Sequence, residues 1–421
     1  SIALQYLGNI VENGLIPSLQ EMESLQGVSV SNSWNGGDIV IKIQYATLTS
    51  RVVSHLMVSS FSKLVEEPTA MPLMDQILTL IHSFLSQWLP YILNNGKGAI
   101  NDVTLRTQLE ELLHVHCDLI VKLQHSHPVA FVRYLTPYLH LFHVSLMCIV
   151  GGPGEANEKA TDASAYTRMR LSSQFAIFFI SFLANVVGSS HYSELDAAKN
   201  ELARFFTPSL IQSTSLFLLE ILSIHIIHGD DDNDDAVQWQ DDPEAFYWWE
   251  DARSSEEDIG CAAQNLFLAL AESPFSNEII LPWFVGLLTN VASQRLAVQI
   301  EGGITTGINA HIQPAALPLG VSAKLTHSSN AANDLILQWD AIYTAAGLMS
   351  SILEGCPGFD FRSWFDASLG PCLALLLHQN GISFVNKAHL PILRRRIVWL
   401  ISCNAHQILL ASPLNPLGML V

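Results

Sequence analysis

Apolar residues recur at helical spacing along nearly the whole of this chain, and that period limits its fold more than any other feature. Alternation of apolar and polar residues, the pattern of a strand, is nearly absent. In one segment a single stripe at helical spacing is formed by Ala176, Phe179, Ile180, Leu183 and Val187. Short breaks rich in Gly, Pro, Asn or Ser separate such segments. The pattern predicts an all-α protein.

The periodic segments predict a series of helices along the chain. Proline near the start of a segment, as at Pro128, Pro208 and Pro391, suits the first helical turn, where its missing N–H costs nothing. The predicted helices run over Ile2–Glu12, Pro17–Leu25, Asp38–Glu66, Leu73–Leu93, Asn101–His125, Pro128–Val150, Tyr166–Val187, Glu194–Phe206, Pro208–His228, Glu256–Ala271, Asn277–Ala297, Asn333–Glu354, Phe361–His378 and Leu390–Leu410.

Many helices joined by short turns leave two architectures open, a bundle-like globule and an α-solenoid. Helix pairs of about 40 to 47 residues are the period of HEAT and armadillo repeats, and roughly nine or ten of them would fill this chain. The spacing favours the solenoid, although the segments have little sequence similarity to one another. We therefore predict an all-α superhelix of HEAT-type helical hairpins, with an acidic loop insertion and further flexible insertions.

Changes in composition divide the chain. A stretch rich in Gly, Pro, Ser and Thr from Gln299 to Asn330 predicts a flexible insertion. Because the first residues include neither an initiator Met nor a signal peptide, we expect the chain to continue at both ends. The predicted organisation is a first solenoid segment over 1–228, an acidic, Trp-rich loop insertion over 229–258, repeat helices over 259–298, the flexible insertion over 299–330 and a last solenoid segment over 331–421.

The acidic segment, Gly229–Asp258, is the first candidate binding element. It holds 13 of the 39 acidic residues of the chain and one of the 20 basic ones, so most of the formal net charge of −19 lies here. Its aspartates repel one another and predict a solvated loop. The candidate contact residues are Asp230, Asp231, Asp232, Asp234, Asp235, Asp241, Asp242 and Glu244, followed by an aromatic anchor of Trp239, Phe246, Trp248 and Trp249. The alternative is a surface insertion whose aromatic residues dock on their own helices.

The overall charge narrows the class of partner. A strongly acidic chain argues against direct nucleic-acid binding, which needs Lys and Arg against phosphates, and favours a basic protein partner.

The chain is 49% hydrophobic, which raises the question of a membrane span, but polar residues interrupt every long apolar run. We expect no membrane insertion. Its cysteines form no close pair, which is typical of reduced thiols in the cytosol or nucleus.

Motifs for catalysis are not found in the sequence. The segment Asn94–Gly98 has a Gly-Lys pair but lacks the other residues of a phosphate-binding loop, and no nucleophile elbow occurs. His114 and His116 lie in a His- and Cys-containing segment, but on a helix they point about 200° apart, so packed or surface histidines are favoured over a metal site. We expect neither an enzyme nor a bound cofactor.

The basic cluster of the chain consists of Arg394, Arg395 and Arg396. Consecutive helical residues fan across about 200°, so these three cannot all meet one ligand. A structural role, in which they tie neighbouring helices together through carboxylates, is favoured over contact with a partner.

Several segments share the motifs of one known family. Trp239–Phe246 reads WQDDPEAF, Asp340–Leu348 reads DAIYTAAGL, Phe361–Phe365 reads FRSWF and Leu393–Ile401 reads LRRRIVWLI. They resemble, in the same order, the W-x-x-D-P-E-x-F, D-A-x-Y-x-A-x-G-L, F-x-x-W-F and L-R-R-R-x-x-W-L-I segments of the importin-beta (karyopherin-beta) superfamily. Gln124–Pro128 is a weaker match upstream. The clear resemblance covers about Trp239 to Ile401, and the stretch over 299–330 departs from it.

The resemblance implies a nuclear transport receptor built as a HEAT-repeat solenoid. Such receptors carry protein cargo through nuclear pores under control of the Ran GTPase, and they shuttle between cytoplasm and nucleus. The implied partners are Ran, mainly through repeats outside this chain, basic protein cargo, and Phe-Gly nucleoporins. The acidic segment would contact cargo or Ran. The alternative is a HEAT-repeat scaffold of a multiprotein assembly without Ran-dependent transport.

Overall fold

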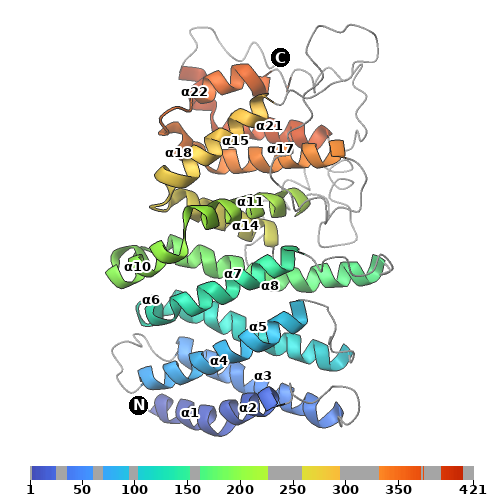
Figure 1. The fold of residues 1–421 in the computed structure, drawn as a ribbon, viewed down its shortest axis with the longest axis vertical. Helices are drawn as coiled ribbons and strands as arrows, with labels where there is room; N and C mark the ends of the chain where they lie inside the picture. Colours follow the sequence, from blue (N-terminus) through green and yellow to red (C-terminus); the bar gives the residue numbers. More distant parts are fainter. Residues whose placement is uncertain are drawn as a thin grey trace. The chain divides into compact units, whose positions relative to one another are not determined.

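The computed structural model describes residues 2–24, 36–59, 70–93, 103–151, 162–225, 258–293, 331–370, 373 and 390–410. These residues form α-helices with short 3₁₀ and π-helical turns, and no strand occurs among them. The predicted all-α class is therefore confirmed for this part of the chain. The chain divides into two compact units, Ser1–Phe206 and Thr207–Val421 (Figure 1). This division falls between α10 (Asp196–Phe205) and α11 (Pro208–His225), both of which lie inside the predicted first segment over 1–228.

The first unit consists of two layers of helices (Figure 1). In one layer α3 packs on α5 and α5 packs on α8; in the other α2 contacts α4, α4 contacts α7 and α7 contacts α10. The elements of the first layer are α3 (Gly36–Ser59), α5 (Val103–Ser126) and α8 (Asp162–Gly188). Those of the second are α1 (Ile2–Ile10), the π-helical turn η1 (Val11–Leu15), α2 (Ile16–Ser24), α4 (Ala70–Leu93), α6 (Pro128–Phe131), η4 (Val132–Tyr134), α7 (Leu135–Gly151), α9 (Ser190–Glu194) and α10 (Asp196–Phe205).

Helix α4 illustrates how the helical period produces these layers. Its fully buried residues Met74, Ile77, Leu78, Ile81 and Phe84 recur every three or four positions and face the core between the layers. Burying a large aliphatic or aromatic side chain contributes about 1.5–3 kcal/mol, so such a stripe fixes the orientation of the helix.

An aromatic cluster fills the core between α7 and α8. Phe142 lies 4.9 Å from both Phe179 and Phe182, measured between ring centroids, and Tyr138 lies 5.8 Å from Phe142. All four side chains are buried, and the Tyr138 hydroxyl donates to the Leu78 carbonyl of α4 at 2.7 Å. The cluster therefore joins the two layers of the unit, because its rings come from both of them.

Several predicted helices are interrupted; Leu390–Leu410, for example, is divided at Asn404. The predicted helix Pro128–Val150 is divided into α6, a 3₁₀ turn at Val132–Tyr134 and α7. Pro137 lacks the N–H for an intrahelical bond, and its ring would clash with the carbonyl four residues earlier, so the backbone tightens before it and α7 starts anew. The predicted helix Asn333–Glu354 breaks at Met349, which separates α17 (Ala331–Leu348) from α18 (Ser350–Glu354).

The second unit is built around α17. This helix packs on α11 and on α21, while α15 contacts η6 and α19 contacts α22. The elements are α11 (Pro208–His225), α14 (Ile259–Glu272), η5 (Ser276–Ile280), α15 (Leu281–Ser293), α17 (Ala331–Leu348), α18 (Ser350–Glu354), α19 (Phe361–Trp364), η6 (Phe365–Leu369), α21 (Leu390–Cys403) and α22 (Ala405–Leu410). None of the described helices of either unit combines the length and the apolarity needed to cross a bilayer.

Candidate functional site

The acidic segment predicted as a binding element lies outside the described residues, apart from its last residue. Asp258 is buried and begins α14, where its carboxylate accepts a hydrogen bond from the backbone N–H of Cys261 at 2.8 Å. It is therefore an N-cap of this helix. The predicted contact residues Asp230, Asp231, Asp232, Asp234, Asp235, Asp241, Asp242 and Glu244, and the predicted anchor residues Trp239, Phe246, Trp248 and Trp249, are not among the described residues.

The basic cluster lies on α21, and Arg396 forms a buried ion pair there. Its Nε is 3.1 Å from Oδ1 of Asp340 on α17, and the side chains are 9% and 0% exposed. The Arg396 guanidinium also lies 5.1 Å from the ring of Trp399. Arg394 and Arg395 are half-buried. Arg396 therefore ties α21 to α17 through a carboxylate.

Gly347 and Trp399 bring the same two helices into close contact. A Cβ atom added at Gly347 would lie 2.1 Å from Cζ3 of Trp399, a distance at which one of the two must move. Only glycine therefore lets the indole lie against the backbone of α17. The segments DAIYTAAGL and LRRRIVWLI thus meet at two points, the ion pair and the glycine contact.

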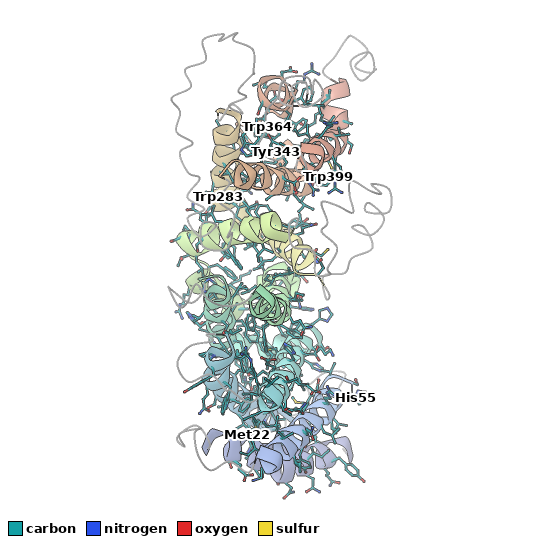
Figure 2. The ribbon with its side chains drawn as sticks, turned by 90° about the vertical axis from the view of Figure 1, so that its right-hand side faces the viewer. Met22, His55, Trp283, Tyr343, Trp364 and Trp399 are labelled. Atoms are coloured by element: carbon teal, nitrogen blue, oxygen red, sulfur yellow. The ribbon has the colours of Figure 1, made fainter. Side chains whose placement is uncertain are left out.

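The segment FRSWF joins the same core. The buried Trp364 donates its indole N–H to the Leu288 carbonyl of α15 at 3.3 Å, and its ring centroid lies 5.9 Å from that of Tyr343 (Figure 2). The segments FRSWF and LRRRIVWLI therefore both pack against α17, which itself carries DAIYTAAGL.

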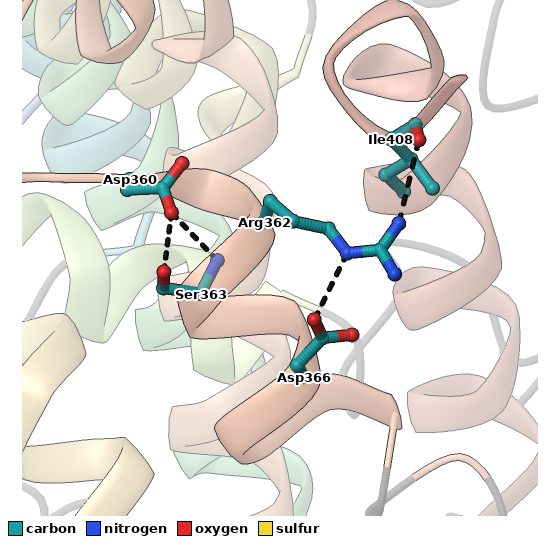
Figure 3. Close-up of polar contacts among 5 residues, drawn as sticks. All are labelled: Asp360, Arg362, Ser363, Asp366 and Ile408. Atoms are coloured by element: carbon teal, nitrogen blue, oxygen red, sulfur yellow. Dashed lines mark hydrogen bonds and ion pairs between the residues drawn. The ribbon is translucent and has the colours of Figure 1, made fainter. Parts of the chain in front are cut away.

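Polar contacts hold α19 in place (Figure 3). Asp360 caps the helix by accepting from the backbone N–H of Ser363 at 2.9 Å and from its hydroxyl. These hydrogen bonds hold the pKa of Asp360 below its usual value. Arg362 pairs with Asp366 at 2.9 Å and donates to the Ile408 carbonyl of α22 at 3.3 Å. Only the hydrogen bond from Arg362 to the Ile408 carbonyl joins two helices, α19 and α22, whereas the other contacts lie within the helical turns that follow Asp360.

The first unit contains a groove that the sequence analysis did not predict. Its volume is about 540 Å³, and it lies between α3, α5 and α8. Two exposed ion pairs border it, Arg51 with Glu111 and Lys122 with Asp118, each at 2.7 Å. Its lining residues are Arg51, Ser54, His55, Val58, Ser59, His114, Val115, Asp118, Lys122 and Phe178. Figure 2 shows His55 at the edge of this unit.

His114 and His116 of α5 lie in different surroundings. His114 lies in the groove wall with its ring centroid 4.2 Å from that of Phe175, and burial lowers its pKa to about 4. His116 is fully buried on the opposite side, where Nε2 lies 2.9 Å from the hydroxyl of Ser50, and burial lowers its pKa to about 3. Both are neutral near pH 7. Within the described residues no group of three or more His, Cys, Asp or Glu side chains could hold a metal ion.

The groove residues were not predicted because each one reads as an ordinary surface or core position. Ser54, His114 and Phe178 lie on three helices that only tertiary folding brings together. The available signal was the absence of acidic residues from α3 between Ile39 and Ser59, which leaves Arg51 and His55 as its basic groups beside the groove. Searches of family models, of curated proteins and of solved structures find no match to this chain.

Proposed function

We propose that this chain is part of a nuclear transport receptor of the importin type, a non-enzymatic carrier of basic protein cargo controlled by the Ran GTPase. The observation that carries the proposal is the core around α17. The segments DAIYTAAGL, FRSWF and LRRRIVWLI resemble the importin-beta superfamily, and their Asp340, Trp364 and Arg396 make the contacts that join four helices. Because these side chains meet specific partners in the core, a substitution at any of them would disturb the packing. This is a physical reason for a family to share the motifs.

The helix layers support a HEAT-type solenoid as the architecture of the proposed receptor. In the first unit, α3, α5 and α8 stack in sequence order, and the helices between them form the second layer. Stacked helical hairpins that contact mainly their neighbours are the defining geometry of solenoids. A bundle would bring helices distant in sequence into one shared core.

The acidic charge supports basic cargo as the ligand. A formal net charge of −19 attracts basic surfaces over long range and accelerates their association. In this proposal the acidic segment 229–258 contacts cargo or Ran, other surfaces of the receptor meet Phe-Gly nucleoporins, and the protein shuttles between cytoplasm and nucleus. A HEAT-repeat scaffold without Ran-dependent transport is the second candidate, because the described motif residues have structural roles that a scaffold would equally need.

Affinity capture with the intact protein tests the proposal. The protein is incubated with cell extract, with GTP-locked Ran, with GDP-bound Ran as a control, or without Ran, and bound proteins are identified by mass spectrometry. Partners released specifically by GTP-locked Ran would support import, and partners gained would indicate export. If the bound proteins are indifferent to Ran, the transport proposal fails and the scaffold is favoured.

A second experiment tests the role of the acidic segment. We expect replacement of its five leading aspartates by asparagine to slow cargo association and to flatten its dependence on salt. The matched control neutralises the same number of exposed carboxylates elsewhere, namely Glu12, Glu194, Asp196, Glu272 and Glu278. Equal effects of the two sets would show that only net charge matters and that the segment is not a contact site.

A further inference from the structure

The groove between α3, α5 and α8 differs in charge from the chain that contains it. Two cations, Arg51 and Lys122, line it together with one carboxylate, Asp118, whereas the whole chain has a formal net charge of −19. Among the lining residues, those of α3 include no carboxylate and present the hydroxyl of Ser54 and the imidazole of His55. A basic recess in a strongly acidic protein favours anionic groups at this one place.

Both cations keep donors for a further acceptor. Arg51 donates through one nitrogen, Nη2, to Glu111, and Lys122 donates to Asp118. A guanidinium has five N–H donors and an ammonium has three, and neither side chain has a second partner within the described part of the chain. The side chains of Glu111 and Asp118 are 41% and 37% exposed, so water screens their repulsion of an incoming anion. A carboxylate of a ligand could therefore join each ion pair.

The part of the groove between the two ion pairs is apolar. Val115 lies on the same face of α5 as Glu111 and Asp118, four residues after the first and three before the second. Val58 of α3 and Phe178 of α8 also line the groove, and all three apolar side chains are half-buried. The groove therefore has an apolar centre with a cation toward each end.

The positions of the cations along α5 set the spacing of the anions that fit. From Glu111, which holds Arg51, Asp118 lies about 10.5 Å along the helix axis and Lys122 lies about 16.5 Å along it, at about 1.5 Å per residue. An extended peptide spans about 13 Å in four residues, and its first, third and fifth side chains point to the same face. Acidic residues four positions apart, with an apolar residue midway between them, therefore match the groove.

We propose that this groove binds an extended acidic segment of a partner protein, in which two carboxylates four positions apart flank a central apolar residue. The carboxylates join Arg51 and Lys122, the apolar side chain lies over Val115, and Ser54 and His55 supply polar groups for the peptide backbone. The groove volume of about 540 Å³ falls within the range of about 300–1,000 Å³ that is typical of ligand sites. This inference does not rest on the transport proposal.

Titration of the fluorescently labelled whole chain with the peptide GSESLSEGS, followed by thermophoresis, tests the proposal. We expect saturable binding with a dissociation constant on the order of 100 micromolar, because both charged ends stay partly solvated. The peptide GSQSLSQGS has no charged side chain and should bind at least about tenfold more weakly. The peptide GSELSSEGS has the same composition and charge, but its leucine points to the opposite face, so it should bind at least about threefold more weakly.

Three variants of equal charge locate the binding site. Arg51→Gln and Lys122→Gln remove the two groove cations, and each is expected to raise the dissociation constant for GSESLSEGS at least about threefold. Arg204→Gln is the matched control, because Arg204 of α10 is also exposed and ion-paired but does not line the groove. Each substitution removes one positive charge, so the long-range attraction or repulsion of the peptide changes equally in all three. Circular dichroism verifies that the variants remain folded.

Three results would overturn the proposal. The first is a lack of saturable binding of GSESLSEGS at millimolar concentration. The second is equal affinity for GSQSLSQGS, which would show that the groove does not select carboxylates. The third is an equal effect of Arg204→Gln and the two groove substitutions, which would show that the peptide binds elsewhere on the chain.

Discussion

The two units of this protein each tie neighbouring helices with a buried polar pair, but the pairs differ in charge. In the first unit, Ser50 of α3 meets His116 of α5, and both are fully buried and neutral. In the second unit, Asp340 of α17 meets Arg396 of α21, and both are buried and charged. A neutral pair costs little to bury, whereas a charged pair is stable only while both charges are present. The stability of the first unit therefore depends on pH through His116. The stability of the second unit depends on keeping both charged residues of the pair.

Breaking the charged pair should have the largest effect. We expect Arg396→Met to lower the free energy of unfolding of the second unit by about 3–5 kcal/mol, because it leaves the Asp340 carboxylate buried without its guanidinium. Urea denaturation followed by tryptophan fluorescence measures the change. The double variant Arg396→Met with Asp340→Leu is the control and should recover most of the loss. If the double variant is as unstable as the single one, the lost charge pairing is not the cause.

The glycine contact between the same helices should have the next largest effect. Gly347→Ala is expected to cost about 2–3 kcal/mol, because its Cβ would overlap the indole of Trp399. Gly286→Ala is the matched control, since a Cβ there meets nothing within 4 Å, and it should stabilise α15 by about 0.5–1 kcal/mol. Thermal and urea unfolding measure both. Adding Trp399→Leu to Gly347→Ala should relieve the overlap, and a lack of any relief would contradict the explanation.

The neutral pair predicts a dependence on pH. The unfolded chain protonates His116 below about pH 6.5, whereas the folded chain resists protonation until about pH 3. The free energy of unfolding is therefore full above pH 6.5 and falls as the pH decreases, by about 2 kcal/mol between pH 6.5 and pH 5. Urea titrations at several pH values measure this slope. His116→Gln should reduce it, while the other buried histidines contribute equally to both proteins; an unchanged slope would refute the assignment.

The exposed ion pairs of the groove should have the smallest effect. Arg51 is 58% exposed and Glu111 is 41% exposed, so water screens their attraction. We expect Arg51→Ala to change the free energy of unfolding by less than about 1 kcal/mol. A loss as large as that of Arg396→Met would show that exposure does not separate the two kinds of pair, and the comparison between the units would fail.

Much of the helical structure was predictable from the sequence. Residues such as Phe179 and Leu183 recur at helical spacing because one side of each helix is buried, and that pattern is visible without coordinates. The predicted helix bounds were wrong where a proline or a local turn interrupts a helix without changing the spacing of its apolar residues. The backbone tightens before Pro137 and breaks at Met349, and neither change alters the apolar pattern that was used.

The candidate site was predictable only in part. The sequence predicts a structural role for the arginine cluster and indicates that His114 and His116 point apart, since both conclusions depend only on helical geometry. It did not predict that Arg396 meets Asp340, which lies 56 residues away, or that His116 meets Ser50, which lies 66 residues away. The groove between α3, α5 and α8 was missed for the same reason.

The sequence by itself determined the helical class and the apolar face of most helices, because both follow from the spacing of residues within one turn or two. The tertiary structure alone decided which helices stack, which polar groups pair across 50 residues or more, and that an apolar stripe of α3, formed by Ile41, Tyr45, Leu48 and Val52, remains exposed. An apolar stripe is the same in sequence whether it faces the core, a partner or water. Only the position of the neighbouring helices distinguishes these cases, and that position depends on contacts between residues far apart in the chain.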